Sequence, residues 1–285
     1  MPSPSMGAVS TISETPTRRP PALVHQEWVE RYAWLVQGTT TRGSAPVPFD
    51  LGLFSGGRPR DEVEEHWLAL GKATGMTTLV HAEQVHGSTV RVWDGQSGER
   101  HISLGEDHIP SGEHGRDAPL GLGRTALVLV DACDGHMTDQ PGTLLAVTTA
   151  DCVPIFAVDD ARRAVAAIHA GWRGAAAGVL ERGLALMHAK YGTPPEGLHV
   201  HLGPSICGSC YEVGPEVFRA LDQEVPHQPE PLDLRGVLAA RAVRAGVLPG
   251  HLTVSAHCTR CSESDLYSHR AGDAHRHVGY IGIRP

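Results

Sequence analysis

Apolar residues in this chain follow two patterns, short continuous runs and helical repeats, which alternate along the sequence. Continuous runs rich in Val, Leu, Ile and Ala predict buried strands at residues 125–130, 143–158 and 162–171. Apolar residues at helical spacing, followed by a terminal glycine, predict helices at residues 60–75 and 175–192. Because strands and helices are intermixed and no segment recurs at a fixed period, the pattern favours a single α/β domain over a repeat architecture.

The remaining patterned segments continue this alternation. Two strands are expected within residues 77–94, on either side of a turn that carries His86. The other expected strands lie at residues 28–43, 198–207, 252–258 and 264–283, and the other expected helices lie at residues 215–223 and 233–247.

Two stretches lack either pattern. Residues 1–24 have no apolar middle of the kind that a secretory signal carries, and we expect them to form a disordered tail. Residues 94–123 contain many glycines and three scattered histidines, which is typical of a solvated surface insertion rather than a metal-binding histidine tract. The predicted catalytic domain therefore spans residues 25–285, with a loop insertion at about 94–123.

Composition narrows the class of protein. Of 285 residues, 41% are apolar and 20% are charged, as in an ordinary globular domain. The formal net charge is −8 and no cluster of Lys and Arg is present, so nucleic acid is not an expected partner. No apolar run approaches the roughly 20 residues that span a bilayer, so we expect a cytoplasmic protein without a membrane partner. In such a chain the six cysteines are expected to be reduced.

The stretch 150–174 carries the clearest chemistry. Cys152 follows Asp151 at a break between apolar runs, and His169 ends the next run, just before a turn and a helix start. A thiol and an imidazole at the ends of adjacent strands suit either a metal ion or a nucleophilic Cys/His dyad. His86 is the nearest upstream candidate for a third ligand. These three side chains match the pattern of catalytic zinc, which has three protein ligands and one open position.

Two other metal sites are suggested by pairs of residues. The C-x2-C pairs at 207–210 and 258–261 have the spacing of a structural zinc site, but 47 residues separate them instead of about 15 to 20. The HxH pairs at 199–201 and 275–277 suggest a multicopper oxidase, but the residues after Cys258 offer no histidine or methionine at an axial spacing. The spacing therefore disfavours both sites.

Several short motifs resemble those of one known family. They are QVHG at 84–87, TADCVPI at 149–155, HAGWRG at 169–174, GPSI and CYEVGPEV within 203–217, LDL at 232–234, and CTRC and LYSHR within 258–270. Together these motifs are similar to the laccase-domain family, whose members are described as polyphenol oxidases and as purine nucleoside phosphorylases. The resemblance covers roughly residues 35–284.

The resemblance implies a fold and an activity. The implied fold is a single α/β (α+β) domain, a layered α/β/β/α sandwich with mixed sheets. The implied activity is phosphorolysis of adenosine, inosine and methylthioadenosine to the base and a ribose 1-phosphate, with adenosine deamination in addition, at a Zn²⁺ ion held by His86, Cys152 and His169. Copper-dependent oxidation of phenols has also been attributed to the family, so Cu²⁺ is the alternative metal. The expected partners are a small-molecule nucleoside and phosphate, and the expected state is a monomer or a weak homodimer.

Other polar residues are expected around this ion. The catalytic candidates are Cys152, His169 and Arg173, and the candidates for substrate and phosphate binding are Arg42, Asp50, Ser205 and Arg270. Guanidinium groups bind phosphate bidentately, whereas Asp50 stands where the family commonly has Asn and its charge could repel phosphate. Asp151 is expected either to orient a ligand histidine or to stabilise a turn.

Two alternatives from other classes remain open at this point. A metal-free hydrolase would use Cys152 as its nucleophile and His169 as its base. A zinc-stabilised scaffold, associated with cell-wall synthesis or division, would turn over no nucleoside.

Overall fold

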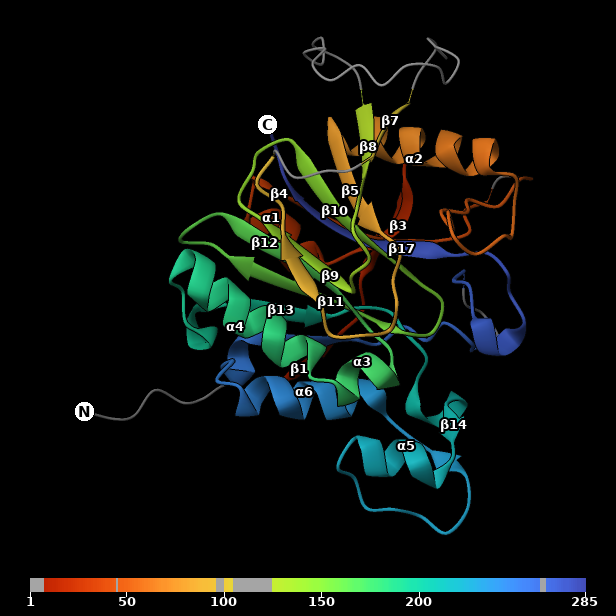
Figure 1. The fold of residues 1–285 in the computed structure, drawn as a ribbon, viewed down its shortest axis with the longest axis vertical. Helices are drawn as coiled ribbons and strands as arrows, with labels where there is room; N and C mark the ends of the chain where they lie inside the picture. Colours follow the sequence, from red (N-terminus) through yellow and green to blue (C-terminus); the bar gives the residue numbers. More distant parts are fainter. Residues whose placement is uncertain (1–7, 45, 96–99, 105–124, 262–264) are drawn as a thin grey trace.

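The computed structural model describes residues 8–44, 46–95, 100–104, 125–261 and 265–285. Two mixed β-sheets form the centre of the molecule (Figure 1). The first sheet contains, in spatial order, β1 (Ser10–Ile12), β16 (Leu252–Ser255), β13 (His199–Leu202), β11 (Val153–Asp159), β12 (Ala164–Ala170), β9 (Gly135–Thr138) and β6 (Val90–Val92). The second contains β2 (Thr15–Arg18), β3 (Pro21–Val24), β4 (Leu35–Thr40), β17 (His277–Ile283), β10 (Thr143–Thr149), β5 (Thr78–Ala82), β8 (Thr125–Val130) and β7 (Arg100–Leu104).

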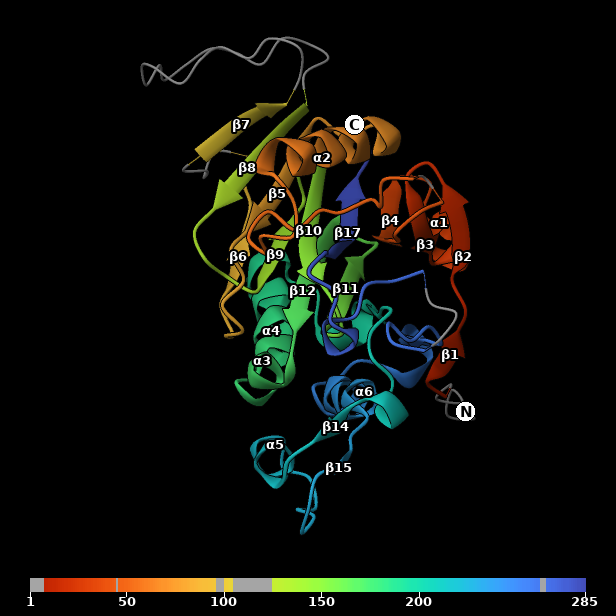
Figure 2. The same cartoon turned by 90° about the vertical axis from the view of Figure 1, so that its right-hand side faces the viewer.

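The longer helices lie on the outer faces of the two sheets (Figures 1 and 2). Helices α4 (Val179–Tyr191) and α6 (Leu234–Arg244) cover the first sheet, and α2 (Arg60–Thr74) covers the second. The shorter helices are α1 (Gln26–Arg31), α3 (Trp172–Ala176) and α5 (Pro215–Ala220), and β14 (Glu212–Val213) pairs with β15 (Glu230–Pro231). This arrangement is the expected layered α/β/β/α sandwich with mixed sheets. No described helix is long and apolar enough to cross a membrane.

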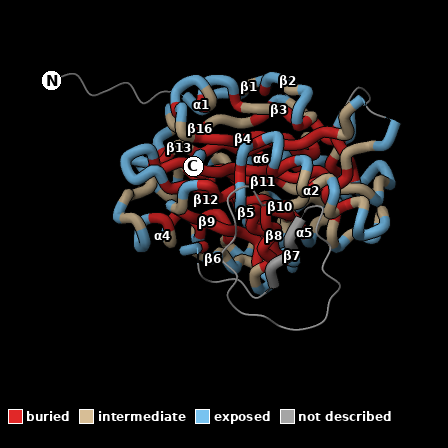
Figure 3. Tube along the Cα trace, turned by 90° about the horizontal axis from the view of Figure 1, so that it is seen from above, coloured by how far each residue is buried: buried red, intermediate tan, exposed pale blue. Residues whose placement is uncertain are grey.

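The central strands are buried on both faces, as Figure 3 shows by the buried trace through the middle of the molecule. In β10, Leu145 and Val147 pack between the sheets, whereas Leu144 and Ala146 pack under α2. The neighbouring strands alternate in the same way, so three layers of apolar side chains separate the four layers of backbone. A strand with two covered faces needs apolar residues at every position, which is why these segments appear in the sequence as continuous runs.

The expected helix ends are confirmed at two glycines. Helix α2 ends at Gly75 and α4 ends at Gly192, with φ values of 73° and 79°. A glycine adopts this left-handed conformation without the steric cost that a side chain would add, so it ends a helix cleanly.

The N-terminal segment departs from the sequence analysis. Residues 1–24 were expected to form a disordered tail, but residues 10–24 form β1, β2 and β3, which extend both sheets. Glu14 between them is buried, and its carboxylate accepts hydrogen bonds from His201 Nε2 at 3.0 Å and Ser255 Oγ at 2.8 Å. These strands have only three or four residues each, too few for a period-two pattern in the sequence, and pairing with neighbouring strands such as β16 and β4 stabilises them.

Two further expectations need correction. Residues 28–43 were expected to begin as a strand, but α1 occupies the first part and only Leu35–Thr40 is extended. The imidazole of His25 caps α1 by accepting from Trp28 N, and a histidine cap is not a usual sequence signal. Within the expected insertion at 94–123, Arg100–Leu104 forms β7, antiparallel to β8, while residues 96–99 and 105–124 lie outside the described part of the chain.

The chain passes from the second sheet to the first three times at one edge of the sandwich. These connections run from β5 to β6, from β8 to β9 and from β10 to β11. They carry His86, Asp134 and Cys152, respectively, and β12 ends beside them with His169. The fold therefore gathers four separate segments at one place.

A shortened chain tests the contribution of residues 10–24. We expect a chain that begins at His25 to lose at least about 3 kcal/mol of unfolding free energy, because His201 and Ser255 would be left buried without Glu14. The measurement is urea denaturation, with a chain that begins at Val9 as the control because it keeps all three strands. Equal stability of the two shortened chains would show that these strands are dispensable.

Candidate functional site

His86, Cys152 and His169 meet at this edge of the sandwich. Each offers one ligand atom, and the three atoms lie within 4.8 Å of one another. The two imidazole rings meet edge to face, with centroids 4.8 Å apart and planes at 85°. Tetrahedral zinc places its nitrogen and sulfur ligands roughly 3.3 to 3.6 Å apart, so small side-chain movements would bring these three groups around one ion.

Backbone geometry positions two of the three ligands. His86 has a φ of 58°, which turns the chain sharply before Gly87. Cys152 follows Asp151, whose φ of 88° makes the turn between β10 and β11. His169 instead lies in a regular strand, paired with Pro154 of β11. One ligand therefore rests on a rigid strand and two rest on tight turns beside it.

Asp134 connects these segments. Its carboxylate is fully buried and accepts from His169 Nδ1 at 3.0 Å, from His86 N at 2.9 Å and from Gly87 N at 2.7 Å. Burial raises the pKa of this carboxyl, but the hydrogen bonds from His169 and the two backbone N–H groups outweigh it and lower the pKa. The bond to Nδ1 leaves Nε2 of His169 to bind a metal, an arrangement that recurs in metalloproteins.

Cys152 and His169 form an ion pair in the absence of metal. Burial would raise the pKa of Cys152, but His169 and His86 outweigh it and lower the pKa to about 6. Burial would lower the pKa of His169, but Cys152 and Asp134 raise it to about 9. At neutral pH the pair is a thiolate and an imidazolium, so a metal ion binding there displaces a proton from His169.

Asp151 has a turn role rather than a role at a ligand histidine. Its Oδ1 accepts from Thr259 Oγ1 at 2.5 Å, its Oδ2 from Arg270 N at 2.8 Å, and its carbonyl from Ile206 N at 3.1 Å. The histidine-orienting carboxylate is Asp134, which the sequence analysis missed. Asp134 comes next to His169 only because β9 pairs with β12, and a lone aspartate before a strand carries no signal of that pairing.

Two glycines let helix α3 approach the ligands. A Cβ at Gly171 would lie 3.0 Å from Cys152 Sγ and 3.2 Å from His86 Cδ2. A Cβ at Gly174 would lie 2.9 Å from the carbonyl oxygen of Gly87. The HAGWRG motif therefore has glycines because backbone and ligand side chains are in close contact, since a methyl group would push Cys152 or the His86 turn aside.

The three ligand residues line a cavity of about 320 Å³. An ion bound by them would be open to this space, whose volume falls at the small end of the range for ligand pockets, about 300–1,000 Å³. Phe54 lines it with half of its surface exposed. The other lining residues are Gly52, Ser55, Glu83, Gln84, Thr148, Thr149, Ala150, His269 and Arg276.

The arginines that the sequence analysis selected do not line this cavity. Arg173 stacks over the ring of Trp172, with 4.4 Å to the centroid. Arg270 stacks over Tyr211 at 5.1 Å and donates to the carbonyl of Glu212 at 2.8 Å. The arginine among the lining residues is Arg276, which the sequence analysis did not select, and its Nη1 donates to the carbonyls of Asp273, Ala274 and His275 at 2.8 to 3.1 Å.

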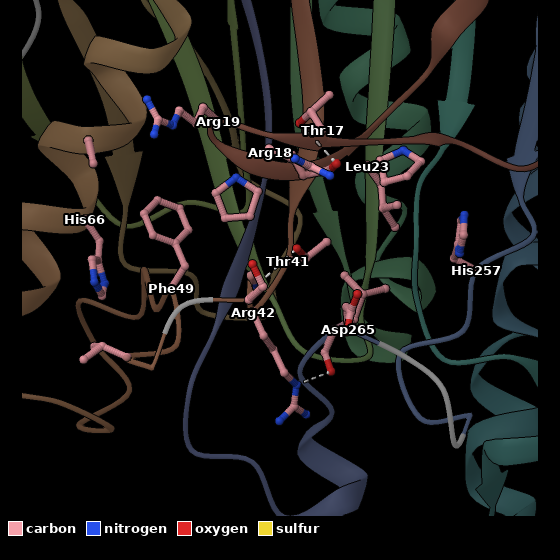
Figure 4. Close-up of a pocket in the computed structure, with 18 of the residues that line it drawn as sticks. Thr17, Arg18, Arg19, Leu23, Thr41, Arg42, Phe49, His66, His257 and Asp265 are labelled. Carbon is pink, nitrogen blue, oxygen red and sulfur yellow. Dashed lines mark hydrogen bonds between the residues drawn. The ribbon is translucent and has the colours of Figure 1, made fainter.

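Arg42 lies in a different and larger cavity of about 1,220 Å³ (Figure 4). It pairs there with Asp273 at 2.6 Å and donates to the carbonyl of Leu266 at 3.0 Å. Arg18 and Arg19 line the same cavity, but His86, Cys152 and His169 do not. Size alone therefore does not identify the site, and the smaller cavity is the one that holds the convergent ligands.

Asp50 and Ser205 lie outside the smaller cavity as well. Asp50 is fully buried, and its carboxylate accepts from Gly52 N at 3.0 Å and Arg276 N at 2.8 Å and contacts His275 Nδ1 at 3.0 Å. It thus anchors a wall of the cavity instead of presenting a charge to phosphate. Ser205 is fully buried, and its backbone bridges to Cys258.

Within the described residues, two groups of three or more ligand side chains converge. One is the group of His86, Cys152 and His169, and the other consists of four cysteines. Neither is the histidine cluster that a trinuclear copper centre needs. In the HxH pairs, His201 contacts Glu14 and His275 contacts Asp50, so these imidazoles pair with carboxylates.

Replacing Asp134 tests the organisation of the ligands. We expect Asp134→Asn to weaken zinc binding about 10- to 100-fold, because the charge that orients His169 and the His86 turn is lost. Competition with a chromogenic chelator measures the affinity, and Asp139→Asn at an exposed position is the control. An unchanged affinity would mean that Asp134 does not organise a metal site.

Comparisons with known proteins agree with this arrangement. The family model described as multi-copper polyphenol oxidoreductase laccase matches residues 38–284. The chain is 30% identical over 276 residues to the purine nucleoside phosphorylase YlmD of Geobacillus stearothermophilus, covering 89% of this chain and 92% of that protein. The crystal structure of YlmD from Geobacillus stearothermophilus matches with a TM-score of 0.72 at 28% identity, covering 89% of this chain and 93% of that chain.

A second relative carries a different name. The adenosine deaminase RL5, from an unknown prokaryotic organism, is 35% identical over 152 residues, which are 50% of this chain and 57% of that protein. The resemblance drawn from the short motifs is therefore confirmed, and the chain belongs to the multi-copper polyphenol oxidoreductase laccase family.

Proposed function

We propose that this chain is a zinc-dependent purine nucleoside phosphorylase that acts on adenosine, inosine and methylthioadenosine and also deaminates adenosine. The observation that carries the proposal is the convergence of two imidazoles and one thiolate on the wall of a cavity. The names of the relatives support the class of reaction, since YlmD is named a purine nucleoside phosphorylase and RL5 an adenosine deaminase.

The donor set favours zinc over copper. Two histidines, one cysteine and an open position are a common catalytic zinc environment. A blue-copper site uses the same three donors but usually adds a weak axial methionine, and no methionine is among the residues that line the cavity. Within the described residues, nothing besides the wording of the family description points to copper.

Zinc bound at this site supplies a Lewis acid for a phosphate oxygen and lowers the pKa of a water molecule. The residues of the chain prepare the site for it. Asp134 keeps the proton of His169 on Nδ1, and Cys152 is ready as a thiolate. Arg276 provides the positive charge for phosphate, which approaches as an anion.

Three other lining residues suit a nucleoside. The half-exposed ring of Phe54 offers a face for the purine, and stacking of a base on an aromatic ring contributes about 1–3 kcal/mol. Glu83 presents a carboxylate that can accept from ribose hydroxyls. His269 is the lining imidazole that is not part of the ligand group, and it is our candidate for donating a proton to the departing base.

We also propose that the protein works in the cytoplasm, as a monomer or weak homodimer, on small molecules only. None of the six cysteines, all of which lie in the described residues, forms a disulfide, which fits a reducing compartment. The net charge of −8 gives no attraction for nucleic acid.

One observation favours a second candidate. The thiolate and imidazolium of Cys152 and His169 are also the pair that a cysteine hydrolase uses. A cysteine hydrolase needs no third residue beside this pair. The position of His86, within metal-ligand distance of both Cys152 and His169, therefore counts against a cysteine hydrolase. Metal dependence separates the two candidates.

Inosine turnover tests the metal and the phosphate together. We expect ribose 1-phosphate to form only when phosphate and zinc are present, and Cys152→Ala to reduce kcat/KM at least about 10³-fold, equivalent to about 4 kcal/mol of transition-state stabilisation. Cys133→Ala is the matched control, because Cys133 is buried outside both ligand groups. Phosphate-independent hydrolysis, or full activity after removal of zinc, would favour the cysteine hydrolase.

The KM for phosphate distinguishes between Arg276 and Arg270 as the residue that binds phosphate. We expect Arg276→Ala to raise this KM about 10- to 100-fold, since a charge-assisted hydrogen bond contributes about 1.5–3 kcal/mol, while the KM for inosine changes less. Arg182→Ala on the exposed side of α4 is the control. If Arg270→Ala raises the KM for phosphate and Arg276→Ala does not, the assignment made from the sequence is the correct one.

A further inference from the structure

Four cysteines outside the proposed active site form a second cluster. The Sγ atoms of Cys207, Cys210, Cys258 and Cys261 lie within 4.8 Å of one another, and those of Cys210 and Cys261 are 3.9 Å apart. These residues are the two C-x2-C pairs, whose separation in the sequence disfavoured a common site. The structure places them together.

The sheet topology explains the long separation. Strands β13 and β16 are parallel neighbours, with Leu202 paired to Val254, and the pairing continues to a bridge between Ser205 and Cys258. Each strand is followed by one C-x2-C turn, so both turns emerge at the same edge of the sheet. The intervening residues form α5, α6 and the β14–β15 pair, and therefore are not the short loop of a zinc knuckle.

The sulfur positions fit a tetrahedral ion. Zinc bound to four thiolates has Zn–S distances of about 2.3 Å, which places the sulfurs about 3.8 Å apart. Two backbone groups, Cys207 N at 3.2 Å and Arg260 N at 3.4 Å, donate to Cys258 Sγ. Such donors stabilise negative charge on sulfur, and the first of them links one C-x2-C turn to the other.

We propose that these four thiolates bind a structural zinc ion. Four protein ligands leave no open coordination position, so the ion would hold the fold together and would not bind substrate. Cys258 is buried, Cys207 and Cys210 are partly buried and Cys261 is exposed, so an ion can enter from the surface and is then enclosed on the inner side.

The zinc holds the turn that carries Cys152. Ile206 precedes Cys207 and donates from its N–H to the carbonyl of Asp151 at 3.1 Å. Thr259 follows Cys258 and donates from its hydroxyl to the carboxylate of the same aspartate. The two turns that ligate the ion therefore also supply two of the three hydrogen bonds that fix Asp151, the residue before Cys152.

Zinc content of purified variants tests the site. We expect two zinc ions per wild-type chain, one for each ligand group, and a twofold lower content in Cys210→Ser/Cys261→Ser. Cys152→Ala/His169→Ala should also retain one ion, and Cys133→Ser, the matched control, should retain two. Zinc content is measured independently of nucleoside turnover, so a failure of the proposed enzymatic activity would not affect this test of the four-cysteine site. Unchanged zinc in Cys210→Ser/Cys261→Ser would overturn the proposal.

The ligands are identified in a variant that keeps only this site. We expect zinc X-ray absorption of Cys152→Ala/His169→Ala to show a shell of sulfur alone at about 2.3 Å. This result does not require the Cys210→Ser/Cys261→Ser variant to fold. A shell with nitrogen or oxygen, iron in place of zinc, or a disulfide detected by thiol titration of the unfolded protein would each contradict a zinc tetrathiolate.

Discussion

The buried carboxylate of Asp134 is the interaction on which the candidate active site depends. It accepts hydrogen bonds from two proposed metal ligands at once, through Nδ1 of His169 and the backbone N–H of His86. An isolated buried charge is very unfavourable, so this carboxylate is stable only while its three donors stay in place. The donors depend on Asp134 in turn, because the hydrogen bonds to its carboxylate fix them in the geometry that a metal needs.

The location of the site follows from how the chain links the two sheets. His86, Asp134 and Cys152 all lie on connections that leave the second sheet and enter the first. Such a connection cannot continue the hydrogen-bonded ladder of either sheet, so its polar groups need other partners. Three crossings at one edge bring these groups together beside the apolar layer between the two sheets. A polar pocket at this edge is thus a consequence of the topology, and the identity of the side chains makes it a candidate metal site.

The sequence predicted the features that depend on local pattern. Runs such as residues 143–158 identify strands because both faces are covered, and the three candidate ligands, which the structure brings together, could be selected because they lie in distinctive motifs. The sequence did not predict the strands of residues 10–24, because β1 pairs with β16, far along the chain, and β2 and β3 are only four residues long. Asp134 was missed, and a common site for the four cysteines was disfavoured, because segments far apart in the sequence come together in each case. Each depends on which strands become neighbours, namely β9 with β12 and β13 with β16, and this order has no local signature.

The interaction energies at Asp151 indicate why the four-cysteine cluster matters to the group of His86, Cys152 and His169. A non-glycine residue with φ of 88° stores on the order of 1–3 kcal/mol, and the conformation persists only where the surroundings hold it. Three hydrogen bonds of about 1 kcal/mol each can offset that strain, but only if their donors are already ordered. Ile206 and Thr259 lie in loops, and fixing a loop residue costs about 1–2 kcal/mol of conformational entropy. Because a zinc tetrathiolate at Cys207 and Cys258 would fix both loops in advance, the hydrogen bonds could act fully on the Asp151 turn and hold Cys152 in ligand position.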